Sequence, residues 1–267
     1  MHRIHSFSIG EIQAHVLEEN SFQSTVGKEF ILTDHPQHIA EQAIEVGFNY
    51  LLLKVNKQWL IIDSGRGNGN LIQSLKTLEL TPNDIDYVLL THSDGDHIGG
   101  LSAFPNATLV LPEEMHKLWC TPSSSEALLD EFSATPFVQL LPNEKQIAMR
   151  NGKQGFFSFY KELDDAKIKL LKDNTTFLDV IKFFPAKGHR RDHFGIIIQS
   201  GNETLIHCSD AIRDPLQLND IAIVSKYDSD PEECKKTVKA IANRLNDEGS
   251  ETLFCTHYRF PGIIASN

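Results

Sequence analysis

The chain has 267 residues, of which 40% are hydrophobic and 23% charged, and its formal net charge at pH 7 is −11. This composition is that of a globular protein long enough to bury its own core. The acidic balance excludes nucleic acid as an expected partner, because no basic stripe offsets the repulsion of phosphates. The chain lacks a run of about eighteen apolar residues, so we expect no membrane span.

The cysteines indicate a reducing compartment. Cys120, Cys208, Cys234 and Cys255 form no C-x-x-C pair, and a chain of this length can build a core without disulfides. We therefore expect free thiols and a cytoplasmic protein, with Cys208 as a buried strand residue rather than a nucleophile. The N-terminal segment lacks the long apolar core of a signal peptide, although a cleaved leader would not be visible in a mature sequence.

The first half of the chain alternates between strand and helix patterns. Residues 1–46 are mixed and carry no clear pattern. Residues 49–65 contain two apolar runs joined at Asn56-Lys57, which predicts a hairpin. Apolar residues at helical spacing predict a helix over 69–80, and 85–92 reads as a short buried strand that ends at His92. Strand, helix and strand in this order favour a layered α/β fold.

Residues 112–165 look like an inserted region, helical or irregular, that serves as a lid. The segment contains the aromatic run "GFFSFY" (155–160), for which two interpretations stay open. The run is either a core strand or part of an apolar wall, extending from Trp119 to Tyr160, over a substrate.

The second half returns to strands. Residues 176–189 lead to His189, and 194–211 form a hairpin that turns at Ser200-Gly201-Asn202. A helix is expected to begin after Asp230-Pro231 and to stop at Gly249. The last strand, within 251–262, is followed directly by His257.

Potential metal ligands follow four of the expected strands. These residues are the cluster "HSDGDH" (92–97), then His189, Asp210 and His257. Loops at strand ends, held by a rigid sheet, are where α/β folds place their chemistry. Imidazole and carboxylate together suit zinc, iron or manganese. Each residue alone would be an ordinary turn residue, so the interpretation depends on their convergence.

Five motifs in order, "IIDSG", "VLLTHSDGDHIGG", "PAKGHRRDH", "HCSDA" and "CTHY", resemble those of the metallo-β-lactamase superfamily of hydrolases. The resemblance runs from about Tyr50 to Pro261. "FPNATLVLPEEMHKLW" and "HYRFPG" are similar to the branch that holds N-acyl-homoserine lactonases and methyl parathion-type hydrolases. The resemblance implies an α/β fold, the αβ/βα four-layer sandwich, with two mixed sheets flanked by helices. We expect residues 1–267 to form one such domain.

The resemblance also implies a dinuclear centre with two divalent ions. Carried over motif by motif, site one comprises His92, Asp94 and His189, and site two comprises Asp96, His97 and His257, with Asp210 bridging both. Asp63 and His193 would support these ligands from behind. Zinc is the expected ion, with manganese or iron as alternatives beside Asp94.

Asp94 departs from the family pattern His-x-His-x-Asp-His, because it stands where a histidine is expected. With Asp96, Asp210 and a bridging hydroxide, its charge would leave two divalent ions formally neutral. Such extra anionic donation weakens Lewis acidity and raises the pKa of bound water. Oxygen in place of nitrogen also favours a harder ion. Asp94 therefore either tunes site one or marks its loss.

Arg190 and Arg191 replace the Thr-Pro that is usual in the family. These guanidinium groups have three possible roles. They could bind an anionic substrate group, pair with Asp94 or another carboxylate, or form a solvated loop pair. A direct pair between arginine and Asp94 would compete with metal at site one.

The resulting functional hypothesis is a metal-dependent hydrolase in which a metal-bound hydroxide attacks a small lactone or ester. Asp96 would orient this nucleophile and shuttle its proton. A serine nucleophile is disfavoured, because no G-x-S-x-G motif exists. Phosphodiester or phosphotriester hydrolysis is the alternative chemistry, and a non-catalytic ligand-binding protein with a degenerate metal site is the alternative class. We expect a small-molecule partner, and a homodimer is a possible assembly.

Overall fold

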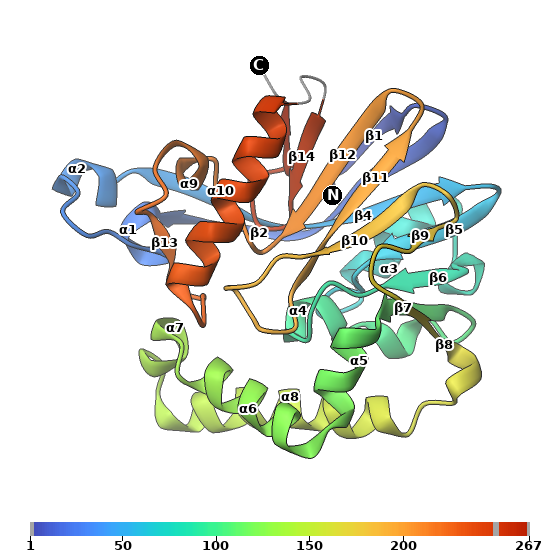
Figure 1. The fold of residues 1–267 in the computed structure, drawn as a ribbon, viewed down its shortest axis with the longest axis horizontal. Helices are drawn as coiled ribbons and strands as arrows, with labels where there is room; N and C mark the ends of the chain where they lie inside the picture. The colour runs from blue at the N-terminus through green and yellow to red at the C-terminus, as the bar shows by residue number, and fades with distance from the viewer. Residues whose placement is uncertain (1–2, 248–250, 266–267) are drawn as a thin grey trace.

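Two β-sheets face each other in this computed structural model, which describes residues 3–247 and 251–265 (Figure 1). The first sheet has seven strands in the order β1-β2-β4-β5-β6-β7-β8. Its strands are β1 Ile4–Ile9, β2 Ile12–Thr25, β4 Ala43–Val55, β5 Gln58–Ile62, β6 Tyr87–Leu89, β7 Thr108–Pro112 and β8 Ile168–Leu171. Strands β1 to β5 pair antiparallel, whereas β5 to β8 pair parallel, so the sheet is mixed.

The second sheet has six strands in the order β15-β14-β12-β11-β10-β9 and is mixed as well. Its strands are β9 Thr176–Phe177, β10 Ile181–Pro185, β11 Phe194–Ser200, β12 Glu203–Ser209, β14 Glu251–Cys255 and β15 Ile263–Ala265. Strands β12 and β14 run parallel with helix α10 (Pro231–Asp247) between them in sequence. A separate short pair joins β3 (Phe30–Ile31) to β13 (Val224–Ser225).

Alternation along the strands explains the layers. Successive residues of a strand point to opposite faces of its sheet. Leu51 and Leu53 of β4 enter the core between the sheets, whereas Leu52 packs on the outer face of the first sheet. In β12, Leu205 enters the central core and Ile206 packs under α10. Helix, sheet, sheet and helix therefore enclose three apolar layers, and the predicted four-layer sandwich is confirmed.

Helices cover the two outer faces (Figure 1). Helix α10 packs on the second sheet and α3 Asn70–Thr77 on the first. The other helices of the described chain are α1 Val26–Glu29, α2 Gln37–Ala40, α4 Gly95–Ile98, α5 Glu113–Cys120, α6 Pro122–Ser133, α7 Pro136–Gln139, α8 Asn143–Lys161 and α9 Leu216–Asn219. The last helix was expected to stop at Gly249, which lies outside the described residues. Among the helices of the described chain, none is long and apolar enough to span a membrane.

Most expected elements are present, and one segment was underestimated. The predicted hairpins at Asn56 and at Gly201 join β4 to β5 and β11 to β12. Asn56 has φ +50° and Gly201 has φ +61°, the left-handed conformations that such tight turns need. The N-terminal segment, which carries no clear sequence pattern, forms β1 and the fourteen-residue β2. Glu18 and Glu19 are buried in β2, and these charges mask the apolar alternation.

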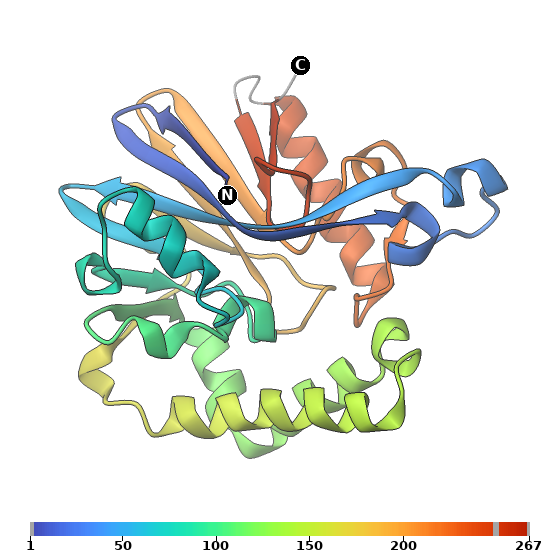
Figure 2. The same cartoon turned by 180° about the vertical axis from the view of Figure 1, so that it is seen from behind.

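The inserted region is helical and lies against one end of the sandwich (Figure 2). Helices α5 to α8 occupy the chain between β7 and β8, two neighbouring parallel strands. The aromatic run is part of helix α8, so the core-strand interpretation is wrong. Phe156 and Tyr160 are buried against Trp119, with ring centroids 5.1 and 4.9 Å away. These rings form the core of the insertion rather than the wall of a pocket.

Candidate metal centre

Four strand ends meet at one edge of the sandwich. His92 follows β6 by three residues, and Asp210 follows β12 directly. His189 lies in the loop between β10 and β11, and His257 lies two residues after β14. The two sheets face each other, so loops from both sheets place their side chains in one small volume.

The loop 92–97 is held by close backbone packing. Asp94 is the N-cap residue of α4, and the carboxylate of Asp192 accepts a hydrogen bond from the Ser93 N–H at 3.1 Å. The Gly100 N–H donates to Gly65 O at 3.0 Å. A Cβ atom at Gly100 would lie 2.0 Å from Ser64 O, so only glycine allows this approach. The last glycine of "HIGG" (97–100) is therefore needed for the close packing of this loop.

Each of the four histidines at the centre is oriented by a hydrogen bond at Nδ1. The partner atoms are Thr91 Oγ1 for His92 (3.0 Å), Asp63 Oδ2 for His97 (2.7 Å), Asp228 Oδ1 for His189 (3.2 Å) and Gly47 O for His257 (3.0 Å). Three partners are pure acceptors. The fourth, Thr91 Oγ1, donates its own proton to Asp63 Oδ2 at 2.7 Å and so accepts from His92. The partners therefore assign the imidazole proton to Nδ1 in all four rings.

This tautomer leaves the Nε2 lone pairs directed into the centre. Within the described part of the chain, Nε2 of His92, His97, His189 and His257 has no hydrogen-bond partner. All four side chains are buried, and a buried nitrogen without a partner is costly. A cation coordinated by these lone pairs removes that cost. The residues present thus fit a metal site.

Carboxylate oxygens lie beside these nitrogens at suitable spacing. Nε2 of His97 and of His257 lies 3.1 and 3.0 Å from the two oxygens of Asp210. The His257 nitrogen is also 3.4 Å from Asp96 Oδ2, and the His189 nitrogen is 3.3 Å from Asp94 Oδ2. Ligand atoms at about 2.1 Å from a tetrahedral ion are roughly 3.4 Å apart. The observed spacings match ligands that share an ion.

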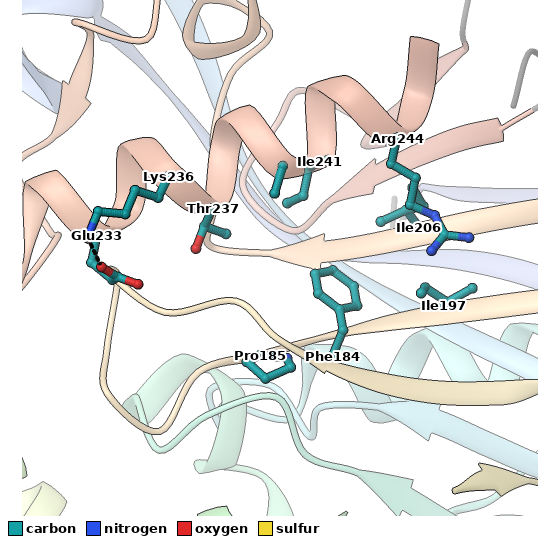
Figure 3. A pocket seen from close by; sticks show the side chains of 10 residues that line it. Phe184, Pro185, Ile197, Ile206, Glu233, Lys236, Thr237, Ile241 and Arg244 are labelled. Carbon is teal, nitrogen blue, oxygen red and sulfur yellow. Dashed lines mark hydrogen bonds and ion pairs between the residues drawn. The ribbon is translucent and has the colours of Figure 1, made fainter. Parts of the chain in front are cut away.

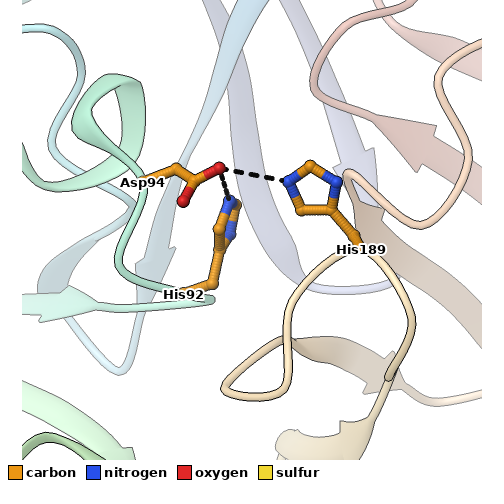
Figure 4. A group of neighbouring side chains, drawn as sticks. All are labelled: His92, Asp94 and His189. Atoms are coloured by element: carbon orange, nitrogen blue, oxygen red, sulfur yellow. Dashed lines mark ion pairs between the residues drawn. The ribbon is translucent and has the colours of Figure 1, made fainter. Parts of the chain in front are cut away.

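The structure brings all seven predicted ligands together. Their donor atoms form three groups, each within 4.8 Å: His92, Asp94 and His189; His92, His97 and Asp210; and Asp96, His97 and His257. Figure 4 shows the first group, in which one oxygen of Asp94 faces both imidazole rings. The first and third groups contain the residues of site one and site two.

Asp94 is already paired with two cations. Arg190 makes a bidentate contact, Nε to Oδ1 at 3.0 Å and Nη2 to Oδ2 at 2.6 Å. Lys153, from α8, donates to Oδ1 at 2.6 Å and to Ser93 O at 3.2 Å. Both cationic side chains are only 3% exposed. Of the roles considered for Arg190, pairing with Asp94 is the one that the structure shows.

Arg190 and Arg191 separate in the structure. Nη1 of Arg190 donates to the backbone oxygens of His189 and Tyr227. The guanidinium group therefore connects the two loops that contain these residues. Arg191 points outward and pairs with Glu131 at the surface. The solvated-loop interpretation therefore holds for Arg191 alone.

Asp210 has a cationic partner that the sequence analysis missed. Arg213, three residues later, donates to Asp210 Oδ2 at 2.9 Å, and its guanidinium lies 4.3 Å from the centroid of the Tyr227 ring. Two of the three carboxylates at the centre, Asp94 and Asp210, thus pair with buried cations, namely Arg190, Lys153 and Arg213. The charge count made from the sequence did not include these three cations, which add positive charge beside Asp94 and Asp210.

Burial and neighbouring charges shift the protonation equilibria. Burial opposes the charge on Asp94, but Arg190 and Lys153 hold the pKa of that carboxyl well below its usual value. Burial lowers the pKa of His92 strongly, and the nearby His97 adds to this effect. For His97, burial is outweighed by Asp210 and other carboxylates, which raise its pKa well above the ordinary value. In the metal-free protein these carboxylates therefore favour a second proton on His97, at Nε2, which a bound cation would displace.

Asp63 and His193 lie behind the ligands. Asp63 accepts hydrogen bonds from the Thr91 N–H at 2.8 Å and from His97 Nδ1. His193 contacts Ala186 O through Nδ1 at 2.6 Å, and the Asp210 N–H lies 3.4 Å from its Nε2. Burial lowers the pKa of His193 to about 3, so this ring is neutral. Both placements suit the supporting roles predicted for them.

Sequence reasoning missed Lys153, Arg213, Asp228 and Asp192. Only Arg213 carried a signal, its spacing of three residues from Asp210. Asp192 accepts hydrogen bonds from Ser93 N and from Trp119 Nε1 (2.7 Å), which connects the ligand loop to the insertion. Cys208 is fully buried in β12, as expected.

A pocket of about 650 Å³ opens over the centre. Its apolar lining consists of Phe22, Phe48, Phe132, Phe137 and Met149, and its charged lining includes Arg66, Arg190 and Arg213. The insertion does contribute to the wall, but through α6, α7 and α8 residues other than those of the aromatic run.

A second hollow, of about 360 Å³, lies between α10 and the second sheet (Figure 3). Phe184, Ile197 and Ile241 line it, and the Lys236–Glu233 ion pair lies at one end. It contains none of the predicted ligands.

A four-layer sandwich with a histidine–aspartate cluster at one edge is the architecture of a metallo-β-lactamase-type scaffold. The family model described as "Metallo-beta-lactamase superfamily" matches residues 45–257. The chain therefore belongs to the metallo-β-lactamase superfamily.

Curated relatives match over shorter stretches. The probable metallo-hydrolase Rv2300c of Mycobacterium tuberculosis is 27% identical over 144 residues, which are 52% of this chain and 41% of that protein. The lactamase-like protein adaB of Aspergillus niger is 43% identical over 56 residues, 21% of this chain and 18% of that protein. The chain thus matches less than half the length of these relatives.

Solved structures match over nearly the whole chain. AidC, a dizinc quorum-quenching lactonase in complex with the product N-hexnoyl-L-homoserine, has a TM-score of 0.79 at 22% identity, covering 98% of this chain and 92% of AidC. The hydrolase AbOPH gives a TM-score of 0.77 at 22% identity, with the same coverage of 98% and 92%. At this identity the likeness shows the fold.

Proposed function

We propose that this protein is a metal-dependent hydrolase that acts on a small lactone or ester. The observation that carries the proposal is the set of four buried imidazoles whose Nε2 lone pairs converge beside three carboxylates at the base of a pocket. Such convergence has no structural use without a cation. We propose further that the chain, with the insertion 112–165, acts as one domain.

The ligands proposed for the ions are those of site one and site two, with Asp210 between them. Divalent ions held there would act as Lewis acids that activate water and polarise the bond under attack. Asp96 is the predicted ligand most open to the pocket, with its side chain 29% exposed. Its carboxylate is placed to orient the attacking water and to accept its proton.

The surrounding residues keep this machinery in place. Asp63 fixes the ring of His97, and Asp228 fixes that of His189. Partners of this kind set the tautomer and orientation of ligating histidines. Arg213 and Tyr227 form part of the pocket lining beside Asp210, which limits the water that reaches it.

The apolar wall supports a substrate with an uncharged hydrocarbon part. Phe22 and Phe48 line one part of the pocket, and Phe132, Phe137 and Met149 from the insertion line another. Apolar walls with a few placed polar groups are typical of small-molecule sites. The fold likeness to AidC, a lactonase by its description, is consistent with a lactone.

Phosphoester hydrolysis is a second candidate, favoured by the arginines in the lining. The guanidinium groups of Arg190 and Arg213 are already paired with Asp94 and Asp210. Arg66 lies at the pocket rim, is exposed, and stacks on Phe48 with 4.8 Å to the ring centroid. Its guanidinium is the group best placed to meet an anionic phosphoryl oxygen.

The test of metal-dependent hydrolysis uses His97→Ala and Asp210→Ala, with the exposed His5→Ala as control. We expect both site variants to lose bound metal, measured by elemental analysis, together with hydrolysis of acyl-homoserine lactones, aryl esters and a phosphodiester. The control should retain both. Parental hydrolysis by either site variant with its metal intact would contradict the proposal.

The Arg66→Met variant distinguishes the two substrate classes by its kcat/KM for each. For a phosphodiester the variant should lose at least tenfold in kcat/KM, because an anionic substrate loses a charged contact. For a neutral lactone the change should stay within about twofold. If kcat/KM for the phosphodiester were also unchanged, Arg66 would have no part in binding an anion.

A further inference from the structure

The two acidic residues of the 92–97 loop differ in their partners. Asp94 pairs with Arg190 and Lys153. Among residues 3–247 and 251–265, the only ion-pair partners of Asp96 are the imidazoles of His97 and His257. Site one and site two therefore contain carboxylates of unequal effective charge.

The cations occupy most of the acceptor capacity of Asp94. A carboxylate offers about four lone-pair positions, two on each oxygen. Oδ1 accepts from Lys153 at 2.6 Å and from Arg190 at 3.0 Å, and Oδ2 accepts from Arg190 at 2.6 Å. The remaining lone pair is on Oδ2, which is the oxygen that lies 3.3 Å from His189 Nε2. Asp94 can thus reach a metal ion through one partly neutralised oxygen.

Lys153 and Arg190 are packed in the interior and are not surface residues. Lys153 and Arg190 both lie 5.1 Å from the centroid of the Phe132 ring, and both are almost fully buried. Solvent therefore screens their charges poorly. Together with Asp94 they bring a net charge of +1 to a position where the family pattern has a neutral histidine.

We propose that Lys153 and Arg190 make site one the weaker and exchangeable metal position, whereas site two retains its ion. The inference rests on the proposed function only in requiring that the centre binds metal. It agrees with the expectation that an arginine paired with Asp94 would compete with metal at site one, and it adds the charge of Lys153, which the charge count from the sequence did not include. Availability of metal would then control the occupancy of site one.

The decisive variant is Lys153→Met. Methionine keeps the apolar stem that packs on Phe132 and removes the ammonium. Asp94 stays paired with Arg190, so the variant leaves no buried charge without a partner. Arg190→Met is a poorer test, because that guanidinium also holds the backbone of His189.

The measurement is equilibrium dialysis against buffered Zn²⁺ concentrations, with ions per chain determined by elemental analysis. The wild-type protein should bind one ion tightly and a second at least tenfold more weakly. In Lys153→Met the second ion should bind about tenfold to 100-fold more tightly, the range typical of changes behind metal ligands. Lys145→Met, an exposed change on the same helix, should leave both affinities unchanged.

Asp94→Asn supplies the complementary result. Loss of the carboxylate should abolish the weaker ion and leave one per chain. If wild type bound both ions equally and Lys153→Met changed neither affinity, the inference would be overturned while the proposed function stood. Absence of any bound ion from the wild-type protein would instead overturn the proposed function as well.

Discussion

Replacing Arg213 by methionine should destabilise the metal-free protein far more than the metal-loaded one. The guanidinium of Arg213 lies 2.9 Å from Asp210 Oδ2, and both side chains are buried. Without it, Asp210 keeps its charge in the interior beside imidazoles and the Ser209 hydroxyl. A divalent ion coordinated by Asp210 can supply the missing positive charge.

The structure sets the size of the effect. At 2.9 Å, and with an effective dielectric constant near 20, the Coulomb attraction is roughly 6 kcal/mol. Desolvation of the two groups offsets part of it, so breaking the pair costs about 3–5 kcal/mol in the metal-free state. If metal halves this loss, the variant gains about 2 kcal/mol in metal affinity by linkage. That difference corresponds to roughly 30-fold tighter binding.

Urea denaturation in a chelator and in saturating Zn²⁺ measures both losses, and Zn²⁺ titration checks the affinity independently. Arg66→Met is the control, because this arginine stacks on Phe48 at the rim and should give small, equal changes in both conditions. Equal destabilisation of Arg213→Met with and without metal would refute the reasoning, since Asp210 would then not be a metal ligand.

Three further changes test the surroundings of the centre. Burial lowers the pKa of His207 to about 4. The folded protein should therefore lose roughly 3 kcal/mol of stability as the pH falls from about 6.5 to 4, because the unfolded chain binds the proton more readily. In His207→Asn the free energy of unfolding should change less over this pH range than in the wild type. Trp119→Phe removes the donor to buried Asp192 and should cost about 1.5–3 kcal/mol by urea denaturation; a loss below 0.5 kcal/mol would mean that this hydrogen bond is unimportant. Gly100→Ala places a Cβ atom 2.0 Å from Ser64 O and should lower the free energy of unfolding by about 1–3 kcal/mol, whereas an unchanged value would show that the loop relaxes freely.

The convergence of the candidate ligands was predictable because several of them lie close after a strand pattern, and the family resemblance implied the individual sites. His92, Asp210 and His257 come just after apolar runs, and facing sheets bring such ends together. The apolar runs predicted the hairpins and a layered α/β fold, whereas the four-layer sandwich was implied by the family resemblance. The long β2 escaped prediction because its buried glutamates break the apolar alternation.

The charge environment of the centre was not predictable from sequence. Lys153 is distant from Asp94 in the chain and lies on a helix where an exposed lysine would look the same. Its burial depends on how α8 packs against the sandwich, which no local pattern specifies. Arg190 was singled out beside its histidine, but only the structure chooses between a substrate contact and a pair with Asp94.

Lys153 belongs to the inserted helices, whereas the predicted ligands all belong to the sandwich. The same helix supplies Met149 to the pocket wall. If Lys153 weakens site one as proposed, an exchange of the insertion for that of a relative would alter the pocket wall and metal retention in one step. Directed evolution of the wall should be carried out with the lysine fixed, so that selection for a new substrate does not also select for a different metal content.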